Sequence, residues 1–473
     1  MSHPPPPVAP GRQPLVGHTL GLLRDPLASL QRWGATDASV VRTRIATMRV
    51  CLATTPATAR AVLVDDRERY QKAEIVRDRL GTLQGDSLVL LEGDAWRERR
   101  RTLRGGFTPD RVASAGTLTT QYASETVASW PDGGVVPVVE TARDLSLALL
   151  ARSLFGLDLR GGETPIHRAA DDVLARLQLD SASTYLPEWV PTPTNRRFRR
   201  AVATLHDRID EVVAERTRES AGDDLSSESD EEPDLLSTMA AAGLPVTEIR
   251  DELIALLFAG FDSTATALAC TLGLLAEHPE VQSRLRDELD AVVGGGPSLT
   301  GAEEAQTDES DSQTRDGDAA PTSADLDELP YLDAVVRESL RLYPPQYLLF
   351  REPTQRVTLG GYDIDAGTTV VVPPWVLHRD PASWDEPTAF RPSRWLDDDG
   401  SVVTDTHPEY AYLPYGAGPR GCLGRRLADQ TLRLIVATVC RRRRLDAVDS
   451  LSVSAGPTLS LDDGLDVRVN ERE

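Results

Sequence analysis

The sequence predicts a mainly α-helical single domain with small β-sheet regions, spanning residues 1–473. From Pro56 to Glu219 apolar residues recur at helical spacing, interrupted by turns rich in Gly, Pro and Asp. A second, strongly apolar helix is predicted from Thr247 to about His278. Alternating apolar residues from Val40 to Leu52, with turn signals nearby, predict short strands.

Three segments depart from this helical pattern. Residues from about 1 to 25 are Pro-rich, and we expect them to run extended over the surface. The stretches 222–234 and 294–329 are acidic and contain few apolar residues. Neither buries enough apolar surface to offset its ordering entropy, so we expect an acidic loop and a mobile insertion that interrupt one domain.

The charge of the chain is strongly negative. It has 51 Lys+Arg against 74 Asp+Glu, a net charge of −23, and Lys72 is its only lysine. Such a surface repels phosphates, so we expect no nucleic-acid partner. An excess of carboxylates suits a halophilic prokaryote, because at molar salt the Debye length falls to about 3 Å and self-repulsion is screened. The alternative is an ordinary acidic protein from a GC-rich genome.

Cysteine usage and the N-terminus indicate a cellular compartment. The four cysteines are widely spaced, with no C-x-x-C pair; they are Cys51, Cys270, Cys422 and Cys440. This usage argues against a disulfide framework or a structural zinc site and fits a reducing cytosol. The N-terminus has no apolar run behind a basic flank. We therefore expect a cytoplasmic protein, and a monomer.

The segment Leu253–Ala276 is long and apolar enough to span a bilayer and contains one charge, Asp262. An acidic residue in the middle of a lone membrane span is costly without a partner, and no comparable second segment exists. We therefore predict a buried core helix and no membrane span.

The segment Tyr415–Gly424, YGAGPRGCLG, is the most informative motif. Its glycines permit a tight turn and let the backbone pass close to a flat cofactor; they include Gly416, Gly418 and Gly424. Arg420 carries a guanidinium suited to pairing with a carboxylate. A helix is predicted directly after Cys422, and its N–H donors and dipole would favour thiolate. A buried free cysteine in a Gly-rich turn is the alternative.

This segment resembles the haem-binding loop of cytochromes P-450, F-x-x-G-x-R-x-C-x-G, with Tyr415 in place of the usual Phe. The resemblance implies the cytochrome P-450 fold, with haem b (iron protoporphyrin IX) between the long central helix and the helix after the cysteine loop. Cys422 would be the axial ligand of the iron. Other residues of the loop would lie against the cofactor; they are Tyr415, Gly416, Arg420 and Gly424.

Two further motifs follow the family's order. Glu338-Ser-Leu-Arg341 matches E-x-x-R, and FRPSRW, Phe390 to Trp395, matches F-x-P-x-R. The resemblance implies that Glu338, Arg341 and Arg394 form a buried, structural charge network. His378 lies in LHRDP, a stretch that is structural in the family, so we do not expect it to bind iron.

The long apolar helix contains AGFDST, Ala259 to Thr264, which resembles the family's A/G-G-x-D/E-T-T. The resemblance implies that Ala259 lies at the haem, that Gly260 opens space for dioxygen, and that Asp262 and a hydroxyl relay protons. Ser263 stands where the family usually has Thr, and Thr264 follows it. The local alternative is a serine bonded back to its own helix and a glycine that allows close packing.

The remaining motifs concern the haem propionates. Trp96-Arg-Glu-Arg-Arg100 matches the family's W-x-x-x-R, and Arg351 stands where the family often has a propionate-binding Arg or Lys. The resemblance thus implies four propionate contacts, which are Trp96, Arg100, Arg351 and Arg420.

The resemblance implies a monooxygenase that inserts one oxygen atom of O2 into an apolar organic substrate. No flavin or iron–sulfur unit is recognisable in the sequence, so a separate donor must supply the electrons. The segments Arg97–Arg104 and Arg425–Arg426 are basic and favour a ferredoxin or flavodoxin with a separate reductase. The alternative is that these arginines only bind propionates or solvate a helix face.

The substrate is predicted least sharply. LYPPQYLLFREP resembles members that act on long apolar lipids, so we expect a fatty acid, an isoprenoid or a carotenoid-like molecule. The residues expected to face the haem are Leu348, Leu349, Phe350 and Leu88–Leu91. The alternatives are a peroxide-using haem oxygenase or haem isomerase, neither of which needs a proton relay, and a haem-based sensor.

Overall fold

The computed structural model describes residues 3–160, 164–178, 186, 188–222, 234–293, 319–403, 407–461 and 464–472. The predicted acidic loop 222–234 lies outside these ranges apart from its two end residues. Most of the predicted insertion 294–329 also lies outside them, up to residue 318.

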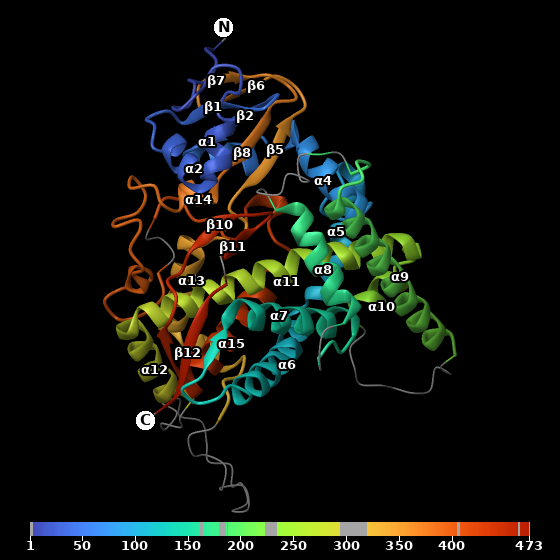
Figure 1. Ribbon diagram of the computed structural model, residues 1–473, viewed down its shortest axis with the longest axis vertical. Helices are drawn as coiled ribbons and strands as arrows, with labels where there is room; N and C mark the ends of the chain where they lie inside the picture. Colours follow the sequence, from blue (N-terminus) through green and yellow to red (C-terminus); the bar gives the residue numbers. More distant parts are fainter. Residues whose placement is uncertain are drawn as a thin grey trace, which may run out of the picture.

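The described residues form helices and four small sheets (Figure 1), as the sequence predicts. The helices are α1 Thr19–Arg24, α2 Pro26–Gly34, α3 Pro56–Arg60, α4 Glu74–Gln84, α5 Gly93–Arg104, α6 Pro109–Ala128, α7 Val138–Phe155, α8 Pro165–Leu177, α9 Pro193–Gly222, α10 Leu235–Ala241, α11 Val246–Glu277, α12 Pro279–Val293, α13 Pro330–Leu342, α14 Pro374–Leu377 and α15 Arg425–Arg442. The strands are β1 Val40–Ile45, β2 Met48–Ala53, β3 Tyr70–Gln71, β4 Val135–Pro137, β5 Leu349–Pro353, β6 Val357–Leu359, β7 Tyr362–Ile364, β8 Thr369–Val372, β9 Arg443–Ala447, β10 Val453–Ala455, β11 Leu459–Leu461 and β12 Asp466–Glu471.

Several helices begin at an Asp-Pro or Thr-Pro pair. The side chain before the proline accepts a hydrogen bond from a backbone N–H of the first turn; these caps are Asp25, Thr55, Thr108 and Thr164. Proline suits the next position because its fixed φ is helical and its missing N–H would be unpaired there in any case. Many of the helix starts are therefore set by local sequence.

Helix α11 crosses the middle of the molecule, with α7 beside it and β11 also in contact (Figure 1). By length and composition alone it could span a membrane, but 78% of its most apolar window is buried inside the protein. Its apolar residues join those of α7 and α15 in the largest core cluster. The prediction of a core helix is confirmed.

The largest sheet joins segments that lie far apart in the sequence. Its strand order is β1-β2-β8-β5-β3, and β8 pairs in parallel with β2 although the two strands are more than 300 residues apart in sequence. Val40–Leu52 forms the predicted strands as the antiparallel pair β1 and β2. The first 25 residues are only partly extended, because Thr19–Arg24 forms α1. That part of the extended-segment prediction is wrong.

The last residues of the predicted insertion belong to the folded domain. Asp325–Glu328 forms a 3-10 helix, in which Leu326 is buried, and Leu329 is completely buried. Both leucines join the core cluster of α11 and α15. The boundary of the insertion is thus misplaced at its carboxyl end, because two leucines among acidic residues are enough to anchor that turn.

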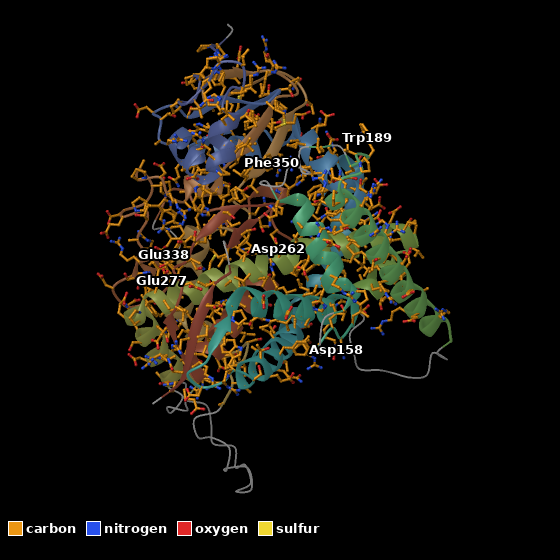
Figure 2. The ribbon with its side chains drawn as sticks, in the orientation of Figure 1. Asp158, Trp189, Asp262, Glu277, Glu338 and Phe350 are labelled. Atoms are coloured by element: carbon orange, nitrogen blue, oxygen red, sulfur yellow. The ribbon has the colours of Figure 1, made fainter. Side chains whose placement is uncertain are left out.

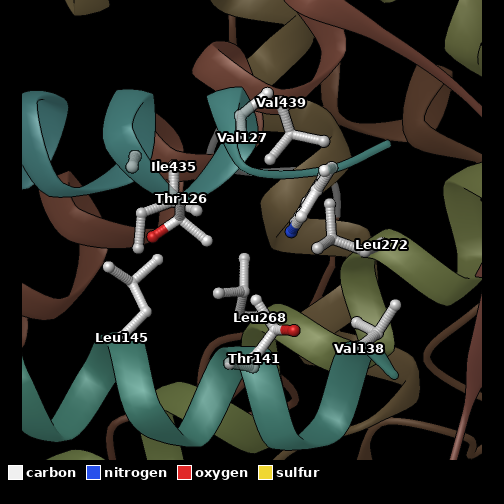
Figure 3. Close-up of a pocket in the computed structure, with 12 residues that line it drawn as sticks. Thr126, Val127, Val138, Thr141, Leu145, Leu268, Leu272, Ile435 and Val439 are labelled. Carbon is white, nitrogen blue, oxygen red and sulfur yellow. The ribbon is translucent and has the colours of Figure 1, made fainter. Parts of the chain in front are cut away.

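A small gap remains in the core between α6, α7, α11 and α15 (Figure 3). Its volume is about 10 Å³, and its walls are mainly apolar. The hydroxyls of Thr126 and Thr141 donate to the Tyr122 and Pro137 carbonyls, four residues earlier, and offer it no free donor. A space of this size holds at most about one water molecule, so it is a packing gap and not a substrate site.

Glu338 on α13 is the centre of a buried charge network. Its carboxylate accepts from Arg341 at 2.8 and 2.9 Å and from Arg394 Nε at 2.9 Å. Trp395 Nε1 also donates to it at 2.9 Å and the Arg391 backbone N–H at 3.0 Å. The three residues of the two sequence motifs are therefore brought together, with neither Glu338 nor Arg341 exposed.

The network is coupled to the cysteine loop through His378. Arg341 donates to the His378 carbonyl at 2.7 Å, and the ring Nδ1 lies 3.1 Å from the Arg341 carbonyl. The ring Nε2 accepts from the Leu413 backbone N–H at 2.7 Å, close before the cysteine loop. Both ring nitrogens are thus occupied by the backbone, which leaves His378 with a structural position.

We predict that Glu338→Ala destabilises the protein by about 3 kcal/mol or more, because it leaves the buried Arg341 guanidinium without its counter-charge. Urea unfolding followed by tryptophan fluorescence measures the change. Glu280→Ala, at a mostly exposed carboxylate, is the control and should be nearly neutral. Equal stability of the two variants would contradict the assigned role of Glu338.

Candidate functional site

The cysteine loop turns tightly between His378 and α15. Gly416 and Gly418 both have φ of +68°, and a side chain at Gly418 would collide with the Leu63 carbonyl. The Cys422 backbone N–H donates to the Tyr415 carbonyl at 2.9 Å. Cys422 is exposed, whereas the other three cysteines are buried. The turn therefore presents one open thiol.

Opposing effects act on the pKa of the Cys422 thiol. Burial among surrounding protein atoms raises the pKa of Cys422, although its surface is open. The Gly424 N–H, Arg100 and Arg425 lower that pKa only in part. The N–H donor at the start of α15 therefore acts in the predicted direction, while burial opposes it.

One face of α11 is open within an otherwise buried stretch. Between Asp251 and Ala276 four residues are not buried, and these are Leu256, Ala259, Gly260 and Ser263. Their spacing of three and four residues places them on a single helix face. The open face includes three of the residues that the sequence assigned to the haem side.

The other residues of AGFDST point elsewhere. Asp262 is buried near the middle of α11 (Figure 2), and Thr458 Oγ1 donates to its Oδ2 at 2.5 Å. Burial raises the pKa of Asp262, while Thr458 and Arg143 lower it. Thr264 is also buried. Thr458 lies between β10 and β11. Neither its sequence neighbours nor its spacing identified it as the partner of Asp262.

Ser263 and Gly260 show the local alternative that the sequence left open. Ser263 Oγ donates to the Ala259 carbonyl at 2.7 Å, within its own helix. A Cβ at Gly260 would lie 2.7 Å from Leu150 of α7. Gly260 therefore allows close helix packing, and the Ser263 hydroxyl keeps its acceptor lone pairs on the open face.

A cationic cluster lies around Trp96, beside the cysteine loop. The Arg420 guanidinium lies 4.7 Å from the Trp96 ring and that of Arg100 5.6 Å. Arg100 Nη2 donates to the Gly421 carbonyl at 2.9 Å, while its buried Nε has no partner among the described residues. These side chains and Arg351 line a cleft of about 570 Å³. The four predicted propionate contacts are thus brought together.

Lys72 belongs to the same cluster, and sequence reasoning missed it. Burial, Arg351 and Arg420 lower the pKa of Lys72 to about 7, against the opposing effect of Glu92. Burial likewise lowers the pKa of Arg351 to about 10. The cleft is lined by seven arginines and only two carboxylates, Glu68 and Glu92, so it favours a further anion. The sequence contains one signal for this role, because Lys72 is the only lysine in a chain that otherwise uses arginine.

These features fit a flat, dianionic cofactor with a metal centre. The open thiol would bind the metal, the open face of α11 would cover one side, and the cationic cluster would bind the acidic edge. Among the described residues no group of three or more His, Cys, Asp or Glu side chains could hold a bare metal ion. Fold and site together therefore define a haem-thiolate protein.

Comparison with known proteins supports this class. The sequence profile described as Cytochrome P450 matches residues 5–451. A cyclooctat-9-en-7-ol 5-monooxygenase of Streptomyces melanosporofaciens is 33% identical over 93% of this chain and 89% of its own length. A pentalenene oxygenase of Streptomyces avermitilis is 28% identical over 92% and 90%, respectively.

Solved structures show the same fold. The haem domain of cytochrome P450DA superimposes with a TM-score of 0.82 at 24% identity, covering 100% of this chain and 99% of that one. A cyanobacterial member with bound retinoic acid gives 0.81 at 23% identity, with complete coverage of both chains. The chain belongs to the cytochrome P450 family, and its cofactor is haem b.

Only some of the residues predicted to face the haem have contacts with the cysteine loop. Leu349 of β5 packs close to Gly416, since a Cβ at Gly416 would lie 3.9 Å from its side chain. Phe350 is the next residue of that strand (Figure 2), but it packs with Leu348 against a different cluster, which includes Trp33 and Trp375. Leu88–Leu91 is half-buried, and Arg420 donates to the Leu91 carbonyl at 3.0 Å. Both segments therefore border the cysteine loop.

We predict that Tyr415→Phe stabilises the protein by about 1 kcal/mol, because the buried Tyr415 hydroxyl has no hydrogen-bond partner among the described residues. Tyr412→Phe is the matched control. It should destabilise, since the Tyr412 hydroxyl donates to the Arg337 carbonyl at 3.1 Å. The urea midpoint of haem loss measures both changes, and a less stable Tyr415→Phe would show that a hydrogen bond was lost.

Proposed function

We propose that this cytochrome P450 monooxygenase inserts one oxygen atom into an isoprenoid substrate. The observation that carries the reaction is the open Cys422 thiol in YGAGPRGCLG, near a helix whose one open face contains Ala259, Gly260 and Ser263. Two similar Streptomyces enzymes, a cyclooctat-9-en-7-ol 5-monooxygenase and a pentalenene oxygenase, have names that point to terpenoid substrates. Fatty acids and carotenoid-like molecules are the other substrates that the sequence predicts.

The chain would hold the cofactor at three places. Cys422 would bind the iron, and the cluster of Trp96, Arg100, Arg351 and Arg420, with Lys72, would bind the propionates. When bound, haem supplies the activation of O2, in which one oxygen enters the substrate, the other leaves as water, and two electrons and two protons are consumed. The half-buried apolar residues of Leu88–Leu91 and Leu349 would exclude water and contact the substrate.

We further propose that Asp262 and Ser263 deliver the protons. Asp262 has a raised pKa and a neighbouring hydroxyl, Thr458, so it is able to hold a proton inside the domain. Ser263 lies on the open face and can accept a proton on its free lone pairs while donating one after rotation. Retention of both residues favours an O2-dependent enzyme over the peroxide-using alternative.

The electron donor is proposed to be an acidic ferredoxin or flavodoxin with its own reductase. Arg97 and Arg101 are exposed on α5, whose Arg100 contacts the cysteine loop, and Arg425 and Arg426 are exposed at the start of α15. This basic surface contrasts with the net charge of −23. We also propose a monomeric cytoplasmic protein from a halophilic prokaryote, in which salt screens the remaining carboxylates.

Substrate class is tested by difference spectroscopy on the ferric enzyme with matched panels of cyclic isoprenoids and fatty acids. An isoprenoid should shift the Soret band at lower concentration. The reduced enzyme with carbon monoxide should show the red-shifted band of thiolate ligation, and Cys422→Ala should lose it. A shift with fatty acids alone would refute the isoprenoid proposal, whereas an ordinary carbon monoxide band in folded wild type would refute thiolate ligation.

The relay is tested by two variants. Asp262→Asn keeps an acceptor for Thr458 but removes the acid, so NAD(P)H-driven turnover should fall about tenfold or more with the Soret band unchanged. Ser263→Ala should raise hydrogen peroxide release per electron, and Ser263→Thr should not. If Thr264→Ala uncouples instead, the hydroxyl acts one position later. Full activity of both variants with hydrogen peroxide alone would favour the peroxide-using alternative.

A KCl titration tests the two surface proposals together. The melting temperature should rise from low to molar KCl as carboxylate repulsion is screened. Reduction by a plant-type ferredoxin should slow over the same range, and Arg97→Glu with Arg101→Glu should slow it at low salt. Arg208→Glu on α9 is the control. A melting temperature that does not change with KCl would favour the alternative that the acidic composition reflects a GC-rich genome. If the double variant is reduced by ferredoxin as fast as wild type, this docking surface is excluded.

A further inference from the structure

Residues 85–92, the loop between α4 and α5, connect the cysteine loop to the first turns of α11. At the carboxyl end of this loop, Arg420 donates to the Leu91 carbonyl at 3.0 Å and also pairs with Glu92. Since Arg420 lies two residues before Cys422, this end is tied to the cofactor side of the domain.

Two buried carboxylates hold the other end of loop 85–92. The Asp86 backbone N–H donates to Asp251 Oδ2 at 3.2 Å, and that of Leu88 donates to Glu252 Oε1 at 2.6 Å. Asp251 is 9% exposed and Glu252 is completely buried. Hydrogen bonds from backbone N–H groups to carboxylates are charge-assisted, so the pair defines the loop position more strongly than neutral acceptors would.

Arg99 of α5 completes this contact. Its Nη1 lies 2.7 Å from Glu252 Oε1 and 3.4 Å from the Asp86 carbonyl, and its other amino group pairs with Glu248. One guanidinium therefore bridges α11 and loop 85–92. The second carboxylate oxygen of Glu252 is buried without a partner among the described residues, so the Leu88 N–H and Arg99 both depend on the first oxygen.

Gly85 is required by the same contact. Its φ is +47°, and a Cβ there would lie 1.9 Å from the Asp251 carboxylate. Only glycine lets that carboxylate reach the Asp86 N–H. Gly81, one turn earlier on α4, has open space around the corresponding position. The two glycines therefore form a matched pair for experiment.

The contact lies next to the haem pocket. Glu252 precedes Leu256, the first residue of the open face of α11, by one helical turn. Leu88, whose N–H Glu252 accepts, is half-buried and packs with the apolar cluster that includes Phe258 and Phe261 of α11. The carboxylates thus decide where loop 85–92 lies relative to the open face.

We infer that Asp251 and Glu252 are positioning residues that hold loop 85–92 over the open face of α11, and that releasing this hold opens the haem pocket to bulky apolar ligands. The inference depends on the haem pocket and not on the isoprenoid substrate. Neither residue is assigned to the proton relay or to the propionate contacts.

The hold should depend on pH. Burial raises the pKa of Glu252 to about 7, whereas Arg99 and the Leu88 N–H lower it and the neighbouring Asp251 raises it further. The other charged groups close by are Glu248, which shares Arg99, and Arg250, which lies against Asp251. As pH falls through 7, Glu252 gains a proton and loses the charge that Arg99 and Leu88 bind. The hold therefore weakens at lower pH.

The test uses the ferric holoenzyme and two azoles that bind haem iron, 1-dodecylimidazole and imidazole. Glu252→Gln should speed dissociation of the bulky azole by about tenfold, the order expected for one lost charge-assisted hydrogen bond. It should also abolish the rise in that rate between pH 8 and pH 6. Gly85→Ala should act in the same direction, whereas Gly81→Ala should leave the rate and its pH profile unchanged.

Imidazole separates gating from changes at the iron. If loop 85–92 is the gate, imidazole dissociation stays constant in every variant. Equal changes for both azoles, or unchanged dodecylimidazole rates in Glu252→Gln and Gly85→Ala, overturn the inference. If Glu252→Gln takes up no haem, the result for Gly85→Ala alone tests the inference, because this variant keeps both Asp251 and Glu252. Failure of the isoprenoid proposal would appear separately, as missing isoprenoid shifts with the azole pattern intact.

Discussion

The carboxylate of Glu338 lies inside the domain and is stable there because two guanidinium groups, an indole N–H and a backbone N–H donate to it. A buried charge with so many donors has one favourable arrangement, and losing a donor is costly. Arg341 extends this order to the carbonyls of His378, Pro387 and Ala389. The position of the cysteine loop relative to α13 therefore depends on charges that touch no cofactor.

Helix α11 combines three tasks along its length. Its first turns carry the buried acids Asp251 and Glu252, which hold loop 85–92. Its middle has one open face in an otherwise buried stretch, and its remaining sides pack on α7 and α15. Because a rigid helix fixes the relative positions of these groups, a shift at the acids is carried directly to the pocket wall.

Charge is distributed unevenly in this protein. The chain as a whole carries −23, yet the cysteine loop lies beside a cluster of cations. Lys72 and Arg351 both have lowered pKa values there, because burial and mutual repulsion disfavour their charges. An anionic cofactor edge relieves that repulsion. A metal ion bound to Cys422 would likewise offset the effect of burial, which raises the pKa of this thiol.

Local patterns in the sequence were sufficient for the helical class, the strands at Val40–Leu52, the core helix and the cysteine turn, because each depends on spacing within a few residues. The motif positions also identified Glu338, Arg341 and Arg394 as members of one buried charge network. Only the tertiary structure decided which distant groups meet, as Asp262 meets Thr458 and Gly260 meets Leu150. It alone decided that burial opposes the N–H donor at Cys422 and that Lys72 joins the arginines. These outcomes depend on desolvation and long-range contacts, which no local spacing contains.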